Sequence, residues 1–238
     1  MLVFAHDSDL HFRPDGPRKI KQKQLELLQE TSAEFVIVTG DLTQNGYNGR
    51  YLNFGLFKFR YGGKEDQLDP LKRQYVNPII DTGKEVYLCA GNHDRGTSFI
   101  KIFKYSPVRR YIRKRHGGNV YNFQVQGLNF VVMDEFPANR KWLKRKLKCH
   151  IDEPFVIAFH FNLEGKFSDW WSQSDKDKFY RCIKGHNILA ILVGHRHVSN
   201  VSEWHGFRVI SSAKNFSLIY YNPEDQVIED VSFSMLDL

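Results

Sequence analysis

The feature that most constrains the fold is a set of five short apolar runs, each of which ends in a polar turn. The runs are four to six residues long, a length typical of buried β-strands and too short for most helices. They occupy residues 2–5, 35–39, 85–89, 155–159 and 188–193. Strands of this kind, separated by amphipathic segments and turns, indicate an α/β protein.

Two amphipathic segments predict surface helices. Residues 18–31 place Ile20, Leu27 and Leu28 on one helical face, with lysine and glutamine elsewhere. Residues 139–148 have the same kind of pattern. We therefore expect both helices to cover a face of a sheet.

The second half of the chain predicts antiparallel strands as well. Residues 120–134 form two apolar stretches around a Gln-Gly turn, and residues 217–233 predict a second hairpin. Strands separated by helices and then by hairpins suggest two sheets sandwiched between helices. No linker interrupts the sequence, so we expect one domain over residues 1–238, with an aromatic and basic excursion near residues 47–63.

Each of the five apolar runs is followed by side chains that can bind metal ions. In open α/β sheets, ligand sites gather where the strands end at their carboxyl edge. The residues concerned are Asp9, His11, Asp41, Asn92, His160, His195 and His197. Each of these residues alone is commonplace, but their joint occurrence at strand ends predicts a single metal centre.

The chemistry of these side chains indicates the class of metal. Imidazole, carboxylate and amide ligands without a thiolate suit zinc, manganese, iron, cobalt or nickel, whereas calcium alone prefers oxygen ligands. Seven ligands are too many for one tetrahedral zinc ion. We therefore expect two divalent ions, with the two carboxylate oxygens of Asp41 bridging them.

The ordered motifs resemble the calcineurin-like metallophosphoesterase superfamily over most of the chain. That resemblance implies a four-layer α/β/β/α sandwich with two mixed sheets and a dinuclear metal site at the strand ends. It implies one ion held by Asp9, His11, Asp41 and His197. It implies a second ion held by Asp41, Asn92, His160 and His195. The loop departs from the family pattern at Asn162, where many relatives have proline, but every ligand position is filled.

The expected reaction is hydrolysis of a phosphoester. Two divalent ions beside two carboxylates leave a net positive charge that attracts a phosphoryl group, and a metal-bridging hydroxide would attack phosphorus in line. His93 follows Asn92 and is the candidate that assists the leaving group. Asp94 either orients His93 or caps the following turn, and the sequence leaves both interpretations open.

The motifs favour a phosphodiesterase. Protein serine/threonine phosphatases of this superfamily carry arginines in the second and third motifs, and residues 40–46 and 90–94 lack them. The lipid-A-pathway pyrophosphatases typically have arginine where His93 stands. The Gly-Asp-Leu-Thr and Gly-Asn-His-Asp segments look more like the cyclic-nucleotide and general phosphodiesterase branch.

Two alternatives stay open. The net charge of +7 and the basic runs at 109–115 and 141–148 are compatible with a nuclease that acts on DNA or RNA, although such runs are also typical of solvated helix faces. A member of this superfamily can also be a partner-binding scaffold with little activity. The filled ligand positions argue against the scaffold.

The stretch from residue 47 to residue 63 begins directly after the second motif. Its candidate substrate-binding residues are Arg50, Tyr51, Lys58 and Arg60, because aromatic faces can stack a base and cations can bind phosphate. The alternative is a hairpin whose aromatic side chains pack on the domain.

Cellular context follows from simpler features. The three cysteines show no metal-type or disulfide pattern, no N-terminal targeting signal is apparent, and no apolar stretch reaches membrane-spanning length. We expect a cytoplasmic enzyme that acts on a phosphoester, and nucleotides and nucleic acids are the candidate substrate classes. The sequence makes no prediction about the oligomeric state.

Overall fold

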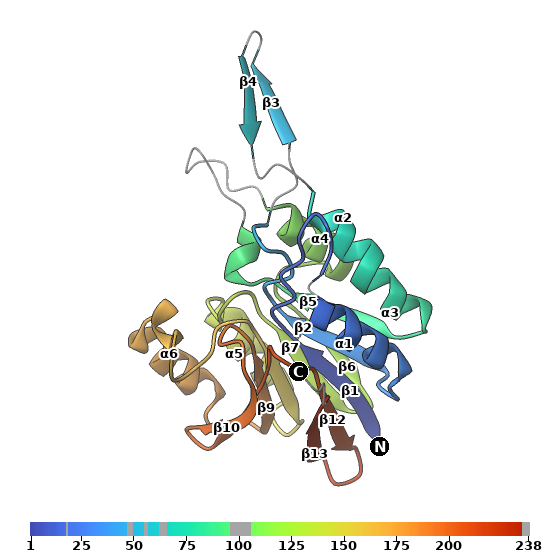
Figure 1. Cartoon of the computed structure of the whole chain (residues 1–238). Coiled ribbons are helices and arrows are strands. Elements are labelled where there is room, and N and C mark those ends of the chain that lie inside the picture. Colours follow the sequence, from blue (N-terminus) through green and yellow to red (C-terminus); the bar gives the residue numbers. More distant parts are fainter. Residues whose placement is uncertain (18, 47–49, 55–56, 62–65, 96–105, 235–238) are drawn as a thin grey trace.

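The computed structural model describes residues 1–17, 19–46, 50–54, 57–61, 66–95 and 106–234, and of residues 50–54 and 57–61 it describes the backbone alone (Figure 1). Within these ranges the chain forms two large sheets, a separate hairpin and helices on the outside.

The first sheet has five strands in the order β13-β12-β1-β2-β5. Its parallel part comprises β1 (Leu2–Asp7), β2 (Phe35–Thr39) and β5 (Glu85–Cys89). The hairpin of β12 (Ser217–Asn222) and β13 (Val227–Phe233) extends the sheet antiparallel to β1. The central strand β2 is buried throughout, as expected of a strand covered on both faces.

The second sheet has six strands in the order β10-β11-β9-β8-β7-β6. Four of them run parallel to their neighbours: β7 (Leu128–Val132), β8 (Phe155–Ala158), β9 (Ile188–Val193) and β11 (Phe207–Ser212). The edge strands β6 (Tyr121–Val125) and β10 (Ser199–Trp204) are antiparallel. The β6–β7 turn has positive φ at Gln126 and Gly127, 46° and 80°, as a tight hairpin turn requires.

Helices cover the outer face of each sheet (Figure 1). On the first sheet lie α1 (Lys19–Glu30) and a nearly continuous helical segment made of α2 (Leu68–Leu71), a π-helical turn (Lys72–Val76) and α3 (Asn77–Asp81). The helix α4 (Pro107–His116) follows β5. On the second sheet lie α5 (Arg140–Cys149) and α6 (Gln173–Ile183).

Alternating side chains of β7 and β8 divide between two apolar interiors. Phe130 points between the sheets, where its ring meets Phe4 of β1 edge-to-face at 5.1 Å. Val131 and Ile157 point the other way and belong to the cluster that includes Leu143 of α5. Period-two alternation explains this division. The architecture is the predicted four-layer α/β/β/α sandwich with two mixed sheets.

The excursion that follows β2 contains a hairpin of its own. Strands β3 (Arg50–Phe54) and β4 (Phe57–Tyr61) pair with each other in a separate two-stranded sheet. In Figure 1 this hairpin extends away from the two large sheets. Residues 47–49, 55–56 and 62–65 lie outside the described residues.

The inner face of α1 differs from the prediction. Leu27 is 38% exposed, whereas Lys21 and Gln24 are buried beside Leu25 and Leu28. The reason is polar pairing: the ammonium of Lys21 lies 2.7 Å from Oδ1 of Asp7 at the end of β1. None of the helices in the ranges that the structure describes is long and apolar enough to span a membrane.

Candidate metal centre

The predicted ligands come together where the parallel strands of both sheets end. Asp9 and His11 follow β1, Asp41 follows β2, and Asn92 begins a 3₁₀ helix (Asn92–Arg95) after β5. From the second sheet, His160 follows β8 and the pair His195 and His197 follows β9. The facing edges of two sheets therefore supply one site.

The backbone is left-handed at most of these positions. The residues with positive φ include Asp9 (55°), His11 (49°), Asp41 (48°), His195 (70°) and His197 (54°). Left-handed conformations cost a non-glycine residue about 1 kcal/mol or more, although aspartate and histidine tolerate them better than most. Strain of this kind concentrates at functional sites, and here it turns successive side chains toward a common centre.

Two motif glycines allow the loops to approach closely. A Cβ atom at Gly194 would lie 1.9 Å from Oγ of Ser8 and 2.6 Å from Oδ2 of Asp9. A Cβ atom at Gly91 would lie 2.2 Å from the backbone nitrogen of Asp41. Glycine is thus required at both positions by contact between loops.

Asp41 lies at the centre of the cluster. Its Oδ2 is 3.3 Å from Nε2 of His160, 3.7 Å from Nε2 of His11 and 3.9 Å from Nε2 of His93. Its Oδ1 accepts a hydrogen bond from the backbone N–H of His93 at 2.9 Å. One carboxylate oxygen thus faces imidazoles that come from both sheets, which is the placement a bridging ligand needs.

A first group of ligand atoms surrounds Asp9. Nε2 of His197 is 3.3 Å and Nε2 of His11 is 3.8 Å from Oδ1 of Asp9. The two imidazole nitrogens lie 3.3 Å apart. Together with Asp9, they form a set of three side chains whose ligand atoms all lie within 4.8 Å of one another.

A second group surrounds His160. Its Nε2 is 3.0 Å from Oδ1 of Asn92 and 3.2 Å from Nδ1 of His195. Asp41, His160 and His195 form a set with the same close spacing of ligand atoms. The two groups contain residues of the two ligand sets that the family resemblance implies, and His11, Asp41 and His93 form a third set with the same close spacing.

The polar atoms of the cluster fit divalent ions better than they fit one another. Oδ1 of Asp9 is buried and makes no hydrogen bond within the described residues, although imidazole nitrogens face it. A buried carboxylate oxygen of this kind is costly unless a cation compensates it. Carboxylate, imidazole and amide donors of this number suit a pair of transition-metal ions.

Charges within the cluster shift the pKa values of its histidines in opposite directions. Burial lowers the pKa of His11 to about 4 and, likewise, that of His195 to about 4. Burial also opposes a proton on His160, but attraction by Asp41 and Asp9 outweighs burial and raises the pKa of His160 to about 9. Without ions, His160 thus keeps its proton beside the carboxylate of Asp41.

Hydrogen bonds outside the cluster fix the orientation of the ligands. Nδ1 of His160 donates to the carbonyl of Thr39 at 2.8 Å, which leaves Nε2 toward Asp41. Oδ2 of Asp9 accepts from Oγ of Ser8 at 2.7 Å and from the backbone N–H of His195 at 2.9 Å. Such partners commonly set the geometry of a metal site.

The ring of His93 lies at the open side of the cluster. Nδ1 lies 2.6 Å from the carbonyl of Gln44. Since a carbonyl oxygen can only accept, Nδ1 carries the hydrogen and Nε2 faces Asp41. The side chain is 36% exposed, and the ring meets that of His11 edge-to-face at 4.7 Å. His93 is therefore within reach of a group bound beside the cluster.

Asp94 connects two motif loops. Its fully buried carboxylate accepts hydrogen bonds from the backbone N–H groups of Leu42 (3.0 Å), Thr43 (2.9 Å) and Gly91 (2.9 Å). None of these partners lies in the turn that follows Asp94, and the ring nitrogen of His93 is oriented by Gln44. Burial raises the pKa of the Asp94 carboxyl to about 6.

Glu135 is a residue that the sequence did not single out. Its backbone carbonyl accepts from the N–H groups of His160 (3.2 Å) and Phe161 (2.8 Å). Its buried carboxylate binds the guanidinium groups of Arg95 and Arg109. Glu135 thus joins the loops that carry Asn92 and His160, and no local pattern around it indicates this long-range role.

The predicted substrate residues lie on the β3–β4 hairpin, and their side chains lie outside the described residues. The strand register pairs Tyr51 with Arg60, and Arg50 with Tyr61. Alternation along the strands places Tyr51, Lys58 and Arg60 on one face of the hairpin and Arg50 on the other.

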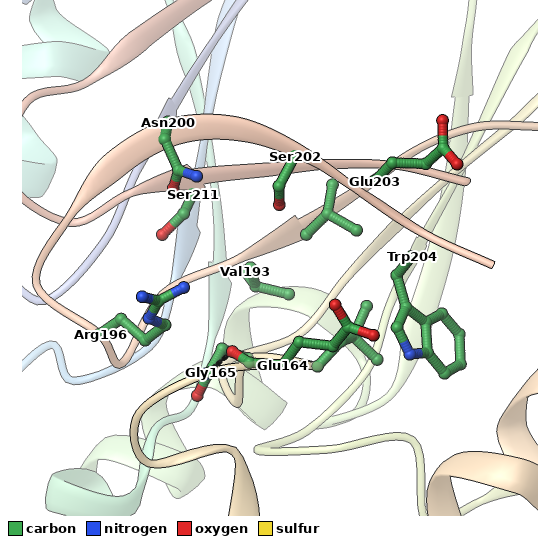
Figure 2. A pocket seen from close by; sticks show the side chains of 12 residues that line it. Glu164, Gly165, Val193, Arg196, Asn200, Ser202, Glu203, Trp204 and Ser211 are labelled. Carbon is green, nitrogen blue, oxygen red and sulfur yellow. Dashed lines mark hydrogen bonds between the residues drawn. The ribbon is translucent and has the colours of Figure 1, made fainter. Parts of the chain in front are cut away.

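A cavity of about 220 Å³ lies next to the loop that carries His195 and His197. Figure 2 shows Arg196, the residue between the two histidines, beside Gly165, with Asn200 and Ser211 on the opposite wall. Arg196 thus packs against the segment that follows β8.

Comparisons with known proteins find relatives in sequence and in fold. A family model described as calcineurin-like phosphoesterase matches residues 2–223. A curated relative from Colwellia psychrerythraea, named a probable cyclic nucleotide phosphodiesterase, is 26% identical over 200 residues, which cover 82% of this chain and 67% of the relative.

Solved structures share the fold at low sequence identity. A dimetal phosphatase from Danio rerio has a TM-score of 0.67 at 12% identity, with 98% of this chain and 95% of that chain covered. A protein described as the anchor in the inner membrane complex of Plasmodium has a TM-score of 0.57 at 12% identity, with 100% and 89% covered. Similarity at this level concerns the fold alone.

Proposed function

Because the chain belongs to the calcineurin-like phosphoesterase family, it is a metal-dependent phosphoester hydrolase, and we propose that its substrates are phosphodiesters. The observation that carries the proposal is the position of Asp41, whose Oδ2 faces imidazoles of both ligand groups within 3.7 Å. The name of the curated relative, a probable cyclic nucleotide phosphodiesterase, supports the diester class.

Asp41 would bridge two divalent ions. The first ion would also be held by Asp9, His11 and His197. The second would also be held by Asn92, His160 and His195. Manganese, iron, zinc, cobalt and nickel all suit these donors.

The ions, when bound, supply positive charge that attracts the phosphoryl group and lowers the pKa of the attacking water. The chain's own residues bind the ions and donate a proton to the leaving group. Asp41 and Asp9 would bind the ions through their carboxylates, and the left-handed backbone at both residues positions the carboxylate oxygens. His93, whose Nδ1 is held by Gln44, presents Nε2 toward the site and, when protonated, donates to the departing ester oxygen.

Hydrolysis of bis(p-nitrophenyl) phosphate and of p-nitrophenyl phosphate tests the proposal directly. We expect manganese-dependent release of nitrophenol that is faster from the diester and that is abolished by a chelator. A faster reaction with the monoester would contradict the diester proposal. No reaction with either compound, with manganese, zinc, nickel or iron, would favour the scaffold.

Elemental analysis of the Asp41→Asn variant tests the bridging role. The amide carries no negative charge and is a much weaker bridge between two cations than a carboxylate, so we expect the variant to lose most of both ions. Asp152→Asn is the matched control, because Asp152 is exposed in a turn after α5. Unchanged metal content in Asp41→Asn would contradict the assignment.

The nuclease alternative has less support. Of the basic run on α4, Arg109 pairs with Glu135 and Asp134, and Arg115 pairs with Glu85. These cations stabilise the fold, so fewer of them are available for phosphates. Binding of a single-stranded oligonucleotide that weakens steeply with salt would revive this alternative.

The hairpin residues Arg50, Tyr51, Lys58 and Arg60 are proposed to contact the substrate, with Tyr51, Lys58 and Arg60 acting from one face. Replacing residues 48–63 by a short glycine-serine linker should then raise KM for a nucleotide diester. An unchanged KM would remove the hairpin from the substrate site.

We further propose a cytoplasmic location. All three cysteines, Cys89, Cys149 and Cys182, are free thiols, which is typical of proteins in a reducing compartment.

A further inference from the structure

Two aromatic side chains project from the loop between β8 and α6 and contact the ring of His195. The ring of Trp170 meets that of His195 edge-to-face at 5.0 Å, and the ring of Phe167 does so at 5.9 Å. Trp170 is 52% exposed and Phe167 is 45% exposed. We call this pair the aromatic ledge.

The ledge differs from the other exposed apolar side chains of the described ranges. The remaining large ones are aliphatic and scattered: Met1, Leu27, Ile151, Val201 and Val227. Single exposed apolar residues are normal on a protein surface. Two aromatic rings on one loop, both against a proposed metal ligand, instead form an apolar surface beside a polar site, as is typical of ligand-binding sites.

The loop that carries the ledge is held by hydrogen bonds. Nδ2 of Asn162 donates to the carbonyls of Glu164 (2.7 Å) and Lys166 (3.1 Å). Nε1 of Trp171 donates to the carbonyl of Asn162 at 3.0 Å. On its other side the loop packs against Arg196 at Gly165 (Figure 2). The ledge therefore lies on a segment that hydrogen bonds and packing hold in place.

Phe167 adopts a left-handed backbone conformation, with φ of 65°. This conformation is an outlier for a bulky side chain, and such strain is kept where the surrounding structure imposes it, often at ligand sites. The turn lets the chain place Phe167 and Trp170 on the same side of the short 3₁₀ helix Ser168–Trp170, so that both rings reach His195.

The chemistry of the ledge suits a planar base. We propose that Phe167 and Trp170 stack the base of a nucleoside phosphodiester whose phosphoryl group lies at the metal centre, an inference that rests on the proposed function. Stacking of a base on an aromatic side chain contributes about 1–3 kcal/mol and tolerates any base. Nζ of Lys166 lies over one face of the Phe167 ring, 4.9 Å from its centroid, so a stacked base would use the other face of that ring.

A pair of substrates with the same leaving group isolates the contribution of the nucleoside. One is thymidine 5′-(p-nitrophenyl phosphate), and the other is methyl p-nitrophenyl phosphate, which has no base. In the wild type we expect a lower KM for the thymidine ester. In Trp170→Ala we expect the ratio of the KM of the thymidine ester to that of the methyl ester to rise about tenfold, which corresponds to about 1.4 kcal/mol.

Further variants separate stacking from packing. Phe167→Ala should act in the same direction as Trp170→Ala, and Trp170→Phe should restore most of the affinity because it keeps an aromatic face. Trp142→Ala, which removes a half-buried tryptophan on α5, is the matched control and should leave the ratio of the two substrates unchanged.

Two outcomes would overturn the proposal. The first is an unchanged substrate ratio in Trp170→Ala. The second is an equal loss on both substrates, since that result would mean that the ledge only supports His195.

A binding measurement keeps the test independent of turnover. Thymidine 5′-monophosphate should quench the tryptophan fluorescence of the protein more strongly than ribose 5-phosphate, and Trp170→Phe should remove most of the quenching. If the wild type hydrolyses neither ester, the proposed function fails while this titration still decides on the ledge. Equal responses to both phosphates would refute base stacking.

Discussion

At the residue scale, the arrangement of the site depends on backbone conformations that the sequence does not display. The motifs predicted which side chains gather at the site, because the chemistry of these side chains and their place after apolar runs are visible in the sequence. The left-handed φ values at Asp9, Asp41 and His195 are not visible, because aspartate and histidine adopt negative φ in most contexts. Only contacts between distant loops impose the left-handed ones.

Close contact between loops makes Gly194 intolerant of any side chain. In Gly194→Ala the new Cβ would meet Oγ of Ser8 at 1.9 Å, and relief of that contact would displace Asp9. We expect the free energy of unfolding to fall by about 1–3 kcal/mol, measured by urea denaturation, together with weaker metal binding. Gly185→Ala is the control, because nothing lies within 4 Å of the Cβ position of Gly185. Its positive φ of 83° is then the only source of strain, and the stability lost in this variant should stay near 1 kcal/mol. Equal losses in the two variants would contradict the close-contact argument.

The exposed ring of His93 supports a separate prediction about proton transfer. His93→Ala should keep both ions, because His93 is not one of the proposed metal ligands. The variant's kcat should nevertheless fall by about 10²–10⁴. The fall should be smaller for a substrate whose leaving group is nitrophenolate than for an alkoxide, since nitrophenolate needs less protonation. His205→Ala, which removes an exposed histidine from the β10–β11 turn, is the control. Wild-type activity on the alkoxide ester would exclude His93 as the proton donor.

At the scale of elements, the sequence predicted strands better than helix faces. The fully apolar runs at β2, β8 and β9 could only be buried strands, and the structure confirms them. The inner face of α1 was mispredicted, because helical periodicity counts apolar residues and cannot foresee that Lys21 is buried against Asp7. A buried lysine is exceptional, and its partner lies on a strand.

The Lys21–Asp7 pair ties α1 to the strand that leads into the metal centre. Nζ of Lys21 also donates to the carbonyl of Ser8 at 2.9 Å, and the hydroxyl of Tyr75 donates to Oδ2 of Asp7 at 2.9 Å. In Lys21→Met the carboxylate would stay buried with less compensation, so we expect about 3–5 kcal/mol lower stability in urea denaturation. Lys23→Met, an exposed position on the same helix, is the control. A loss below 1 kcal/mol would show that Tyr75 alone suffices.

At the scale of the whole molecule, two sheets share one core and jointly form one site. We therefore propose that residues 1–238 fold as a single domain with the β3–β4 hairpin as an excursion. Sequence reasoning could anticipate this, because ligands occur both in the first half and after β8 and β9. It could not anticipate Glu135 and its ion pairs, which join the two sheets' loops and depend on tertiary contacts alone.

The same arrangement couples metal binding to folding and to pH. In the metal-free protein the pKa of His160 is raised to about 9, above its value in the unfolded chain. A proton on His160 therefore stabilises the metal-free fold at pH values below about 6.5, and this contribution is lost as the pH rises toward 9. Metal ions bind the neutral imidazole, so they must displace that proton.

Because the proton and the metal ions compete for His160, the stability of the metal-free protein and its affinity for metal should change with pH in opposite directions. Between pH 7 and pH 9 we expect the Tm of the chelator-treated protein to fall and the affinity for Mn²⁺ to rise, by up to about tenfold per pH unit through His160 alone. Differential scanning fluorimetry measures the Tm, and calorimetric titration measures the affinity for Mn²⁺. Titrations in buffers of different ionisation enthalpy also count the protons released, and we expect about one at pH 7. In His186→Ala, which alters a half-buried histidine after α6, both slopes should persist, because that imidazole is not part of the cluster. If the Tm of the chelator-treated protein does not fall over this pH range, or if no proton is released when Mn²⁺ binds, His160 is neutral before the ions bind and Asp41 does not keep it protonated.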